Sequence, residues 1–286
     1  MRVMILGAGG QVGAELLHHC AAIGDQVQGF TRADVDVADG ARVRELVRAH
    51  TPEVVFNAAA YTAVDRAESE PGQADLVNHV AARRIAEVCR DAQVRLVHYS
   101  TDYVFDGLAV EPIPEDAPTR PQGVYAATKL AGEEAVRRIA PYAYVVRTSW
   151  VYGVNGANFV RTVLRVTRER GEMRVVDDQR GSPTWARDLA LASRELVDVG
   201  PPGTYHLTNG GDCTWFELAR AVVSEAGIDA VVTPIPTSDY PTPARRPPYS
   251  VLDNRAWRDL GRPPLRPWRT AVSEAVHEII AGEEGP

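Results

Sequence analysis

Short apolar runs alternate with amphipathic stretches through the first half of the chain. The apolar runs show little in-and-out alternation, which is typical of strands buried on both faces. They lie at Val3–Leu6, Gln26–Phe30, Val54–Ala60, Val94–Ser100 and Tyr144–Thr148. Between them, a helical period predicts helices at Val12–Ala22, Ala41–His50, Gln73–Ala92 and Val124–Ile139. Strands that alternate with helices predict a parallel sheet with helices on both faces.

The regular alternation loosens after about Trp150. Helical stretches continue at Phe159–Arg170, Thr184–Val197 and Thr214–Ala226, but short strands separate them. The segment 234–248 is rich in proline, whose fixed φ and missing N–H favour extended or turned backbone. The second half therefore predicts a smaller, mixed α/β unit.

We expect an α/β protein of two unequal lobes. Residues 1–150 are predicted to form a doubly wound parallel sheet, with returning segments near 180–200 and 250–265. Residues 151–286 are predicted to form mainly the second lobe. The cleft between the lobes is the expected ligand site.

A glycine-rich turn, Gly7-Ala-Gly-Gly-Gln-Val-Gly13, directly follows the first predicted strand and opens the first helix. Gly7 permits a tight turn, and Gly10 lets the backbone approach a pyrophosphate. Gly13 lets the helix pack close to the strand. In this strand–turn–helix context the turn predicts a dinucleotide site and a Rossmann-type sheet.

The end of the second strand bears on which dinucleotide binds. An acidic residue often binds the ribose there, but this chain has Phe30-Thr31-Arg32. No carboxylate repels a 2′-phosphate at the strand tip, and Arg32 can pair with one. This favours NADPH, while Asp34 or Asp36 leaves NADH open and Arg32 remains open as a plain surface residue.

Charge and composition exclude several classes of protein. The formal net charge is −7, so no general basic surface is available to attract nucleic acid. No apolar stretch approaches the roughly 20 residues of a membrane helix. Cys20, Cys89 and Cys213 are scattered and in no CxxC spacing, which suits a reducing compartment and predicts no zinc site. We expect a cytoplasmic protein with no metal, membrane or nucleic-acid partner.

Lys129 is the only lysine among 31 basic residues. Coding bias explains the arginines, but a lysine that survives it is expected to do something that a guanidinium cannot. Tyr125 lies four residues earlier, on the same face of a predicted helix. A tyrosine has a pKa of about 10, and a nearby ammonium is expected to lower it toward neutrality.

The same lysine can bind the nicotinamide ribose, and the hydroxyl of Thr101, at the end of a strand, can hold a substrate oxygen beside the phenol. A hydride would then pass to a carbonyl carbon while Tyr125 supplies the proton.

Through a longer set of strings the chain resembles the extended short-chain dehydrogenase/reductase family, and within it the dTDP-4-dehydrorhamnose reductases. The likeness runs through nearly the whole chain, and its strings are far more specific than the short motifs. They are 7–13, 57–68 (NAAAYTAVDRAE), 98–107 (HYSTDYVFDG), 124–133 (VYAATKLAGE), 147–153 (RTSWVYG), 158–159, 178–184 and 243–252.

The resemblance implies NAD(P)H-dependent reduction of the C4 ketone of dTDP-4-dehydro-L-rhamnose to dTDP-L-rhamnose, with the second lobe binding the substrate. It implies catalytic roles for Thr101, Tyr125 and Lys129, and Asp102 matches an acid that tunes them. Cofactor contacts are implied at Gln11, Val12, Asp36, Val37, Ala60, Tyr61, Thr62 and Tyr99.

On the substrate side, the resemblance adds Trp150 and Asn158 to Thr101 and Asp102. Trp150 matches a residue that packs on the sugar, although a core aromatic at the junction of the lobes remains open. Arg246, next to Arg245 in a proline-stiffened loop, is a candidate clamp for the pyrophosphate or else a solvated residue.

Some members of the family dimerise through magnesium held by glutamates. Glu15 is present here, but the second position is Arg187, and a cation would be repelled there. The metal-bridged dimer is therefore not expected, and a monomer or a homodimer remains open.

Three other functions stay in view. An epimerase or dehydratase of the same fold is disfavoured, because a dehydratase needs a second acid where Tyr103 follows Asp102. A reductase of another nucleotide 4-keto-6-deoxy sugar remains open. A non-catalytic dinucleotide-binding regulatory subunit is disfavoured by the presence of Thr101, Tyr125 and Lys129 together.

Overall fold

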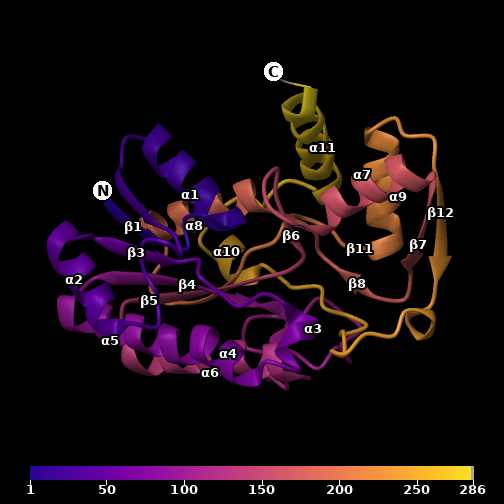
Figure 1. The fold of residues 1–286 in the computed structure, drawn as a ribbon. Helices are drawn as coiled ribbons and strands as arrows, with labels where there is room; N and C mark the ends of the chain where they lie inside the picture. The colour runs from indigo at the N-terminus through magenta and orange to yellow at the C-terminus, as the bar shows by residue number, and fades with distance from the viewer. Residues whose placement is uncertain (285–286) are drawn as a thin grey trace.

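The computed structural model describes residues 1–284, and its larger part is built on one six-stranded sheet (Figure 1). All strand pairs within this sheet are parallel. Their order is β2 (Gln26–Phe30), β1 (Arg2–Leu6), β3 (Val54–Asn57), β4 (Arg95–Thr101), β5 (Ala143–Thr148) and β10 (Gly203–His206). Chain order reverses at β1, which opens a crevice between the carboxyl ends of β1 and β3.

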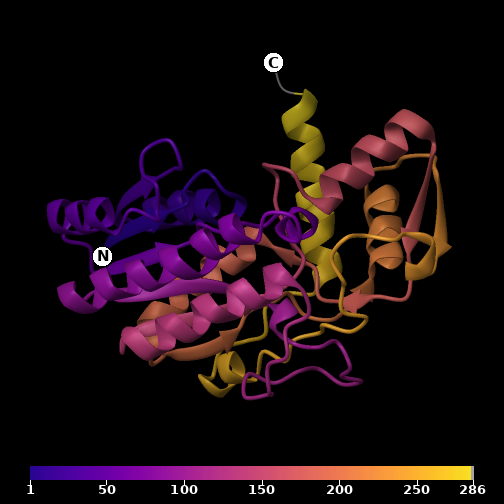
Figure 2. The same ribbon diagram turned by 60° about the horizontal axis from the view of Figure 1, so that its bottom comes forward.

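Helices cover both faces of this sheet because its strands are apolar on both sides. Val3 and Ile5 of β1 pack with α1 (Gln11–Ala22) and α8 (Ala186–Val199), while Met4 and Leu6 face the opposite layer. That layer consists of α2 (Gly40–His50), α5 (Ala82–Ala92) and α6 (Val124–Ile139), which Figure 2 shows in purple and magenta across the sheet. The predicted Rossmann-type α/β fold is confirmed.

The prediction of a single helix at Gln73–Ala92 is wrong in its first residue and in its form, because the helical segment begins at Pro71 and has three parts. It consists of α4 (Pro71–Asp75), a π-helical segment η1 (Leu76–Ala81) and α5. Asn78, buried in the π segment, accepts from the Tyr61 amide and donates to the Thr128 hydroxyl. The wider turn therefore lies where one side chain joins the loop after β3 to helix α6.

The loop after β3 begins earlier than expected. Strand β3 ends at Asn57 rather than Ala60, and α3 (Val64–Ala67) follows. Residues 58–63 leave the sheet at its carboxyl edge, where they run beside the glycine turn.

A smaller group of elements packs around a second core. It contains α7 (Phe159–Arg170), α9 (Trp215–Glu225) and α11 (Trp268–Glu284), together with the parallel pair β7 (Glu172–Val176) and β12 (Val231–Ile235). Two further pairs are β6 (Val151–Tyr152) with β9 (Thr184–Trp185) and β8 (Arg180–Gly181) with β11 (Cys213–Thr214). The remaining short elements are η2 (Asp102–Val104), η3 (Thr237–Asp239) and α10 (Arg255–Asp259).

The two groups exchange chain segments. Helix α8 packs on α1, and β10 completes the large sheet, although both follow residue 180 in sequence. Helix α10 contributes Trp257 to the same core as α8. Returning segments near 180–200 and 250–265 are expected from the sequence, and the division into lobes at residue 150 stays a prediction.

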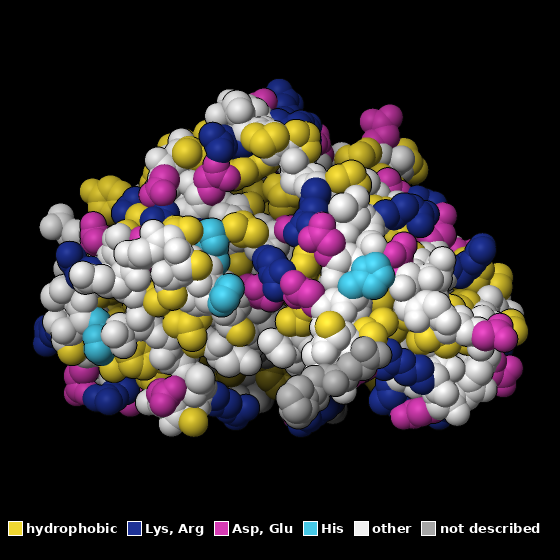
Figure 3. All heavy atoms as spheres, turned by 90° about the horizontal axis from the view of Figure 1, so that it is seen from above, with side chains coloured by type: hydrophobic (Ala, Val, Ile, Leu, Met, Phe, Trp, Pro, Cys, Tyr) yellow, Lys and Arg dark blue, Asp and Glu magenta, His cyan; other side chains and the backbone are white. Residues whose placement is uncertain are grey.

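The surface mixes charges of both signs. On the face seen from above, arginines and carboxylates lie among one another instead of gathering by sign (Figure 3). Cys20, Cys89 and Cys213 are buried and free. Within residues 1–284, no helix is both long and apolar enough to cross a lipid bilayer.

Candidate active site

A cavity of about 600 Å³ lies at the carboxyl edge of the large sheet, where doubly wound folds bind their ligands. The glycine turn and the loop after β3 form one side of it. The end of β4 and the first turns of α6 form its floor. The segment 148–157 and Trp215 close the side toward the smaller lobe.

The glycine turn has the shape that a pyrophosphate needs. Gly7 has φ +83°, and a Cβ there would lie 2.6 Å from the amide nitrogen of Ala59. A Cβ on Gly13 would lie 2.2 Å from the carbonyl oxygen of Gly7. The turn therefore tolerates no side chain at either position, and helix α1 begins at Gln11 directly beside the cavity.

The predicted cofactor residues fall into two sets in the structure. Those that line the cavity are Gly10, Gln11, Val12, Ala60, Thr62, Tyr99, Tyr125 and Lys129. Gly7 and Gly13 shape the turn from behind. Arg32, Asp36, Val37 and Tyr61 lie outside the lining.

Arg32 is exposed just beyond the tip of β2. The neighbouring carboxylate of Asp34 accepts from the Thr31 amide and hydroxyl at 2.8 and 2.7 Å. The exposed guanidinium of Arg32 therefore remains a candidate partner for a 2′-phosphate at this strand end.

Tyr125 and Lys129 lie one turn apart near the start of α6 and face the end of β4. The ammonium of Lys129 is almost fully buried and donates to the carbonyl oxygen of Tyr99 at 2.6 Å. The Tyr125 phenol lies near the Thr101 hydroxyl, and both side chains line the cavity. Thr101, Tyr125 and Lys129, predicted as the catalytic residues, are therefore gathered around one cavity.

The expected effect of the ammonium on the phenol is wrong for this arrangement. Burial raises the pKa of Tyr125 to about 12, and the nearby hydroxyl of Thr101 opposes this rise only in part. Lys129 directs its charge to the Tyr99 carbonyl, and burial lowers its own pKa to about 8. The phenol is accordingly held in its protonated form, which suits a proton donor.

Asp102 is buried beside Thr101 and accepts from its hydroxyl at 3.0 Å. Burial raises the pKa of this carboxyl to about 7, while the nearby hydroxyls of Ser250 and Thr101 oppose the rise. Asp102 can thus hold a proton next to the threonine at neutral pH.

Trp150 lines the cavity in a strained conformation. Its φ is +47°, a region that costs a bulky residue about 1–3 kcal/mol. The ring lies against Gly181, where a Cβ would come within 2.5 Å of it. Trp215 of the smaller lobe stacks on it, and Phe159 meets Trp215 edge-on with ring centroids 4.7 Å apart.

Two residues predicted to bind the substrate do not line the cavity. Asn158 caps α7 by accepting from the Arg161 amide, and it donates to Gln11 Oε1 at 3.0 Å. Arg246 forms a two-pronged ion pair with Asp65, at 2.6 and 2.7 Å. Their hydrogen bonds serve the chain itself and join the two lobes.

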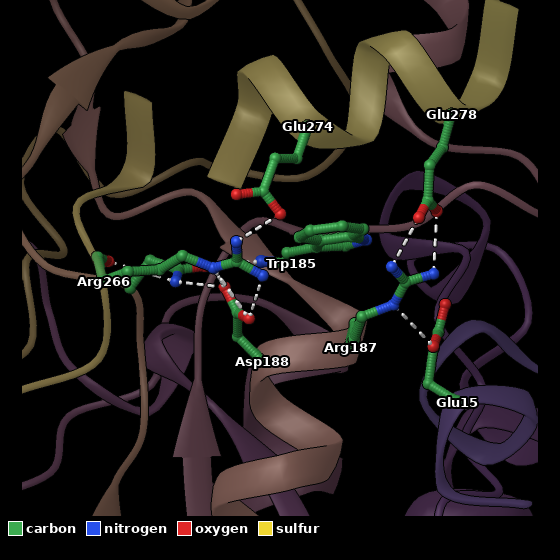
Figure 4. Close-up of polar contacts among 8 residues, drawn as sticks. Glu15, Trp185, Arg187, Asp188, Arg266, Glu274 and Glu278 are labelled. Atoms are coloured by element: carbon green, nitrogen blue, oxygen red, sulfur yellow. Dashed lines mark hydrogen bonds and ion pairs between the residues drawn. The ribbon is translucent and has the colours of Figure 1, made fainter. Parts of the chain in front are cut away.

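The position implied for a magnesium ligand holds a guanidinium. Figure 4 shows Arg187 between two carboxylates: it donates to Glu278 at 2.6 and 2.7 Å and to Glu15 at 3.3 Å. It also stacks on Trp185, with Arg266 on the same ring. These residues do not fit a cation, and no cluster of three His, Cys, Asp or Glu side chains suited to a metal occurs within residues 1–284.

Sequence reasoning missed two aromatic residues of the cavity. Tyr103 packs edge-on against Tyr125, with ring centroids 5.8 Å apart. Trp215 starts α9 after the capping box of Thr214 and Glu217. The capping box is visible in the sequence, but nothing there brings residue 215 next to residue 150.

Comparison with known proteins gives consistent likenesses. The family model for the RmlD substrate binding domain matches residues 1–280. The chain is 44% identical to a dTDP-4-dehydrorhamnose reductase of Streptomyces griseus, covering 99% of this chain and 95% of the relative. It is 42% identical to a dTDP-4-keto-6-deoxy-D-glucose reductase of Streptomyces niveus, covering 99% of each.

Among solved structures, the fold is similar to that of a dTDP-4-dehydrorhamnose reductase from Bacillus anthracis in complex with NADP. The TM-score is 0.94 at 36% identity, covering 97% of this chain and 99% of that one.

Proposed function

Because this chain belongs to the RmlD substrate binding domain family, we propose that it is an NADPH-dependent reductase of a dTDP-linked 4-keto-6-deoxy sugar. The proposed reaction converts the C4 ketone of dTDP-4-dehydro-L-rhamnose into the alcohol of dTDP-L-rhamnose. The observation that carries it is the meeting of Thr101, Tyr125 and Lys129 beside a glycine turn in one cavity. The curated relatives of similar length include reductases of this kind.

The residues of the cavity fit a dinucleotide. The close backbone approaches at Gly7 and Gly13 leave the turn open to a pyrophosphate at the start of α1. Arg32 favours NADPH over NADH, because it offers a guanidinium to a 2′-phosphate. When bound, the nicotinamide supplies the hydride that reduces the ketone carbon.

The chain's own residues handle the ketone oxygen. Thr101 positions that oxygen by a hydrogen bond, and Tyr125 donates its phenolic proton as negative charge develops there. The phenolic proton forms the O–H bond of the product alcohol and leaves a phenolate on Tyr125. Lys129, held by the Tyr99 carbonyl at the wall of the cavity, would bind the ribose of the cofactor.

Two alternative functions remain: a reductase that acts on a different sugar, and a protein that binds NADPH without catalysing any reaction. The likeness to the dTDP-4-keto-6-deoxy-D-glucose reductase of Streptomyces niveus keeps a different 4-keto-6-deoxy sugar as the second candidate. A regulatory subunit that binds NADPH without turnover is the third.

A substrate panel separates these candidates. Protein, NADPH and either dTDP-4-dehydro-L-rhamnose or dTDP-4-keto-6-deoxy-D-glucose are mixed, and the product is identified by NMR. We expect a higher kcat/KM for the first sugar. A reversed preference selects the second candidate, and NADPH binding without oxidation by either sugar selects the third. In parallel, Arg32→Gln is expected to lower kcat/KM for NADPH by about tenfold, the loss of one charge-assisted contact, and to leave NADH unchanged.

A further inference from the structure

Glu133 is a fully buried carboxylate one helical turn beyond Lys129 on α6. It accepts a hydrogen bond from the Ser100 hydroxyl at 2.8 Å, and each of its oxygens lies 3.1 Å from Arg147 Nε. It also pairs with Nη2 of Arg147 and Nη1 of Arg137. A carboxylate with this many donors keeps one position and one charge state.

Two of the three residues that donate to Glu133 lie on neighbouring strands, Ser100 on β4 and Arg147 on β5, and the third, Arg137, lies on α6 itself. Ser100 directly precedes Thr101 on β4, and Arg147 is its register partner on β5. Tyr99, on the other side of Ser100, accepts from Lys129. Helix α6 is therefore attached to the end of β4 twice, once through Lys129 and once through Glu133.

Arg147 is itself held from several directions. It donates to the carbonyl oxygen of Glu115 at 3.0 Å, and its guanidinium lies over the ring of Phe105, 5.1 Å from the centroid. Only 3% of its side chain is exposed. The buried Glu133–Arg147 pair is thus held rigidly beside the strand ends and helix that carry the predicted catalytic residues.

The charges around Lys129 give Glu133 a further role. Burial lowers the pKa of Lys129, and the charge of Glu133 is the influence that raises it again. Burial by itself would raise the pKa of Glu133, but Arg147, Arg137 and Ser100 hold it below its usual value. Glu133 therefore stays an anion through the neutral range.

The other titratable groups near Lys129 do not supply a negative charge that stays constant through the neutral range. On β4, burial and the charge of Lys129 keep the pKa of His98 well below its usual value, so its ring is neutral. On η2, burial raises the pKa of Asp102 to about 7 and that of Tyr103 above its usual range. Tyr125, on α6 itself, is protonated for the same reason.

We propose that Glu133 is a positioning residue of the reductase: its buried carboxylate, bonded to Ser100 and Arg147, holds α6 so that Tyr125 meets Thr101, and it places an opposite charge one helical turn from Lys129. The effect of Glu133 on turnover rests on the proposed function, because turnover requires the reductase reaction. Its first consequence concerns only the charge of Lys129 and is measured without substrate.

The sole lysine makes that measurement direct. Protein labelled with ¹³C at lysine Cε gives a single side-chain resonance, whose pH titration reports Lys129 alone. Glu133→Gln is expected to lower the titration midpoint by roughly one pH unit, the effect of losing a neighbouring opposite charge. Glu133→Asp retains the charge and is expected to stay near the wild-type midpoint. An unchanged midpoint in folded Glu133→Gln overturns the proposal.

A remote buried pair supplies the matched control. Asp25 and Arg194 are similarly buried, with side chains 5% and 7% exposed, at the opposite edge of the sheet. Asp25→Asn is expected to destabilise the protein and leave the Lys129 midpoint where it is. A shift as large as that of Glu133→Gln would mean that any lost buried pair has the same effect, which also overturns the proposal.

A second variant, Arg137→Ala, tests the proposal independently if Glu133→Gln does not fold. Arg137→Ala leaves the Glu133–Arg147 pair in place but removes the half-exposed cation that partly neutralises Glu133. The midpoint of Lys129 is then expected to rise, opposite in sign to the first variant. A midpoint that falls or stays unchanged contradicts the role of Glu133.

Turnover separates this proposal from the function itself. The pH profile of kcat is expected to move with the Lys129 midpoint in Glu133→Gln, with little change in KM for the sugar. If the midpoint moves as expected while wild-type protein reduces no sugar nucleotide, the proposed function fails and the electrostatic role of Glu133 stands. A kcat profile that stays in place while the midpoint moves overturns the role in positioning for catalysis.

Discussion

The indole rings of Trp150 and Trp215 lie parallel, with centroids 3.6 Å apart and an interplanar angle of 8°. Trp150 lies between the end of β5 in the large sheet and the start of β6, whereas Trp215 begins α9 of the smaller lobe. Both line the cavity. The stack therefore closes one side of the cavity with residues from two lobes, and it supports the left-handed backbone of Trp150.

This stack predicts a selective defect in sugar binding. An aromatic pair contributes about 0.5–1.5 kcal/mol beyond its buried area, so Trp215→Ala is expected to raise KM for the nucleotide sugar by up to about tenfold. Trp215→Phe keeps an aromatic face and should be milder. Steady-state kinetics at saturating NADPH measures the change. A defect confined to the KM for NADPH would place Trp215 on the cofactor side instead.

The buried ammonium predicts that arginine cannot replace lysine at residue 129. Its site is 3% exposed and offers the single carbonyl of Tyr99 at 2.6 Å, so a larger planar guanidinium has neither room nor matching acceptors. Lys129→Arg is expected to lower kcat/KM by about 10²-fold or more, close to the loss in Lys129→Ala. An arginine variant within a few-fold of wild type would refute the argument.

The ion pairs of Arg187 with Glu15 and Glu278 predict independence from divalent metal. Both carboxylates are engaged by the guanidinium, which would also repel a cation. EDTA treatment is expected to leave the rate, the thermal transition and the mass in solution unchanged, and added Mg²⁺ should restore nothing. Light scattering with and without Mg²⁺ provides the check, and a magnesium-dependent dimer would disprove this interpretation.

Asp25 predicts how stability depends on pH. Burial by itself raises the pKa of Asp25, but Arg194 and the N-terminal ammonium outweigh it and hold it below its usual value of 3.8. A carboxyl whose pKa is depressed in the folded state stabilises the protein above its unfolded pKa, and this is lost as pH falls through the folded value.

The corresponding measurement uses Asp25→Asn. Near pH 7 the variant is expected to lose about 3 kcal/mol of unfolding free energy, because Arg194 is left buried without its partner. Denaturant unfolding of both proteins should show this difference shrinking below about pH 4, the usual range of the carboxyl. A difference that does not depend on pH would mean that packing rather than charge links these residues.

The sequence foretells those parts of the structure that depend on local patterns. The predicted bounds of Val124–Ile139 and Phe159–Arg170 match α6 and α7, because a helical period and clear ends define both helices. The glycine turn is predicted correctly for the same reason, since Gly7, Gly10 and Gly13 lie within one short motif.

Long-range contacts account for the differences. The π segment at Leu76–Ala81 follows no local pattern, and Asn78 there meets residues distant in the chain. Arg246 looks like a free cation in the sequence but is bound by Asp65, and Trp215 meets Trp150 only after the lobes pack. The pKa of Tyr125 depends on how deeply α6 is buried, which residue spacing does not reveal.

The central claim is that Tyr125 supplies the proton while a dinucleotide lies in the cavity beside it. The most direct test follows loss of NADPH absorbance with dTDP-4-dehydro-L-rhamnose for wild-type protein and Tyr125→Phe, with NADPH affinity measured for both. We predict rapid oxidation by the wild type, a fall of about 10²-fold or more in kcat for the variant, and equal NADPH binding. Near-normal turnover by Tyr125→Phe would contradict the account.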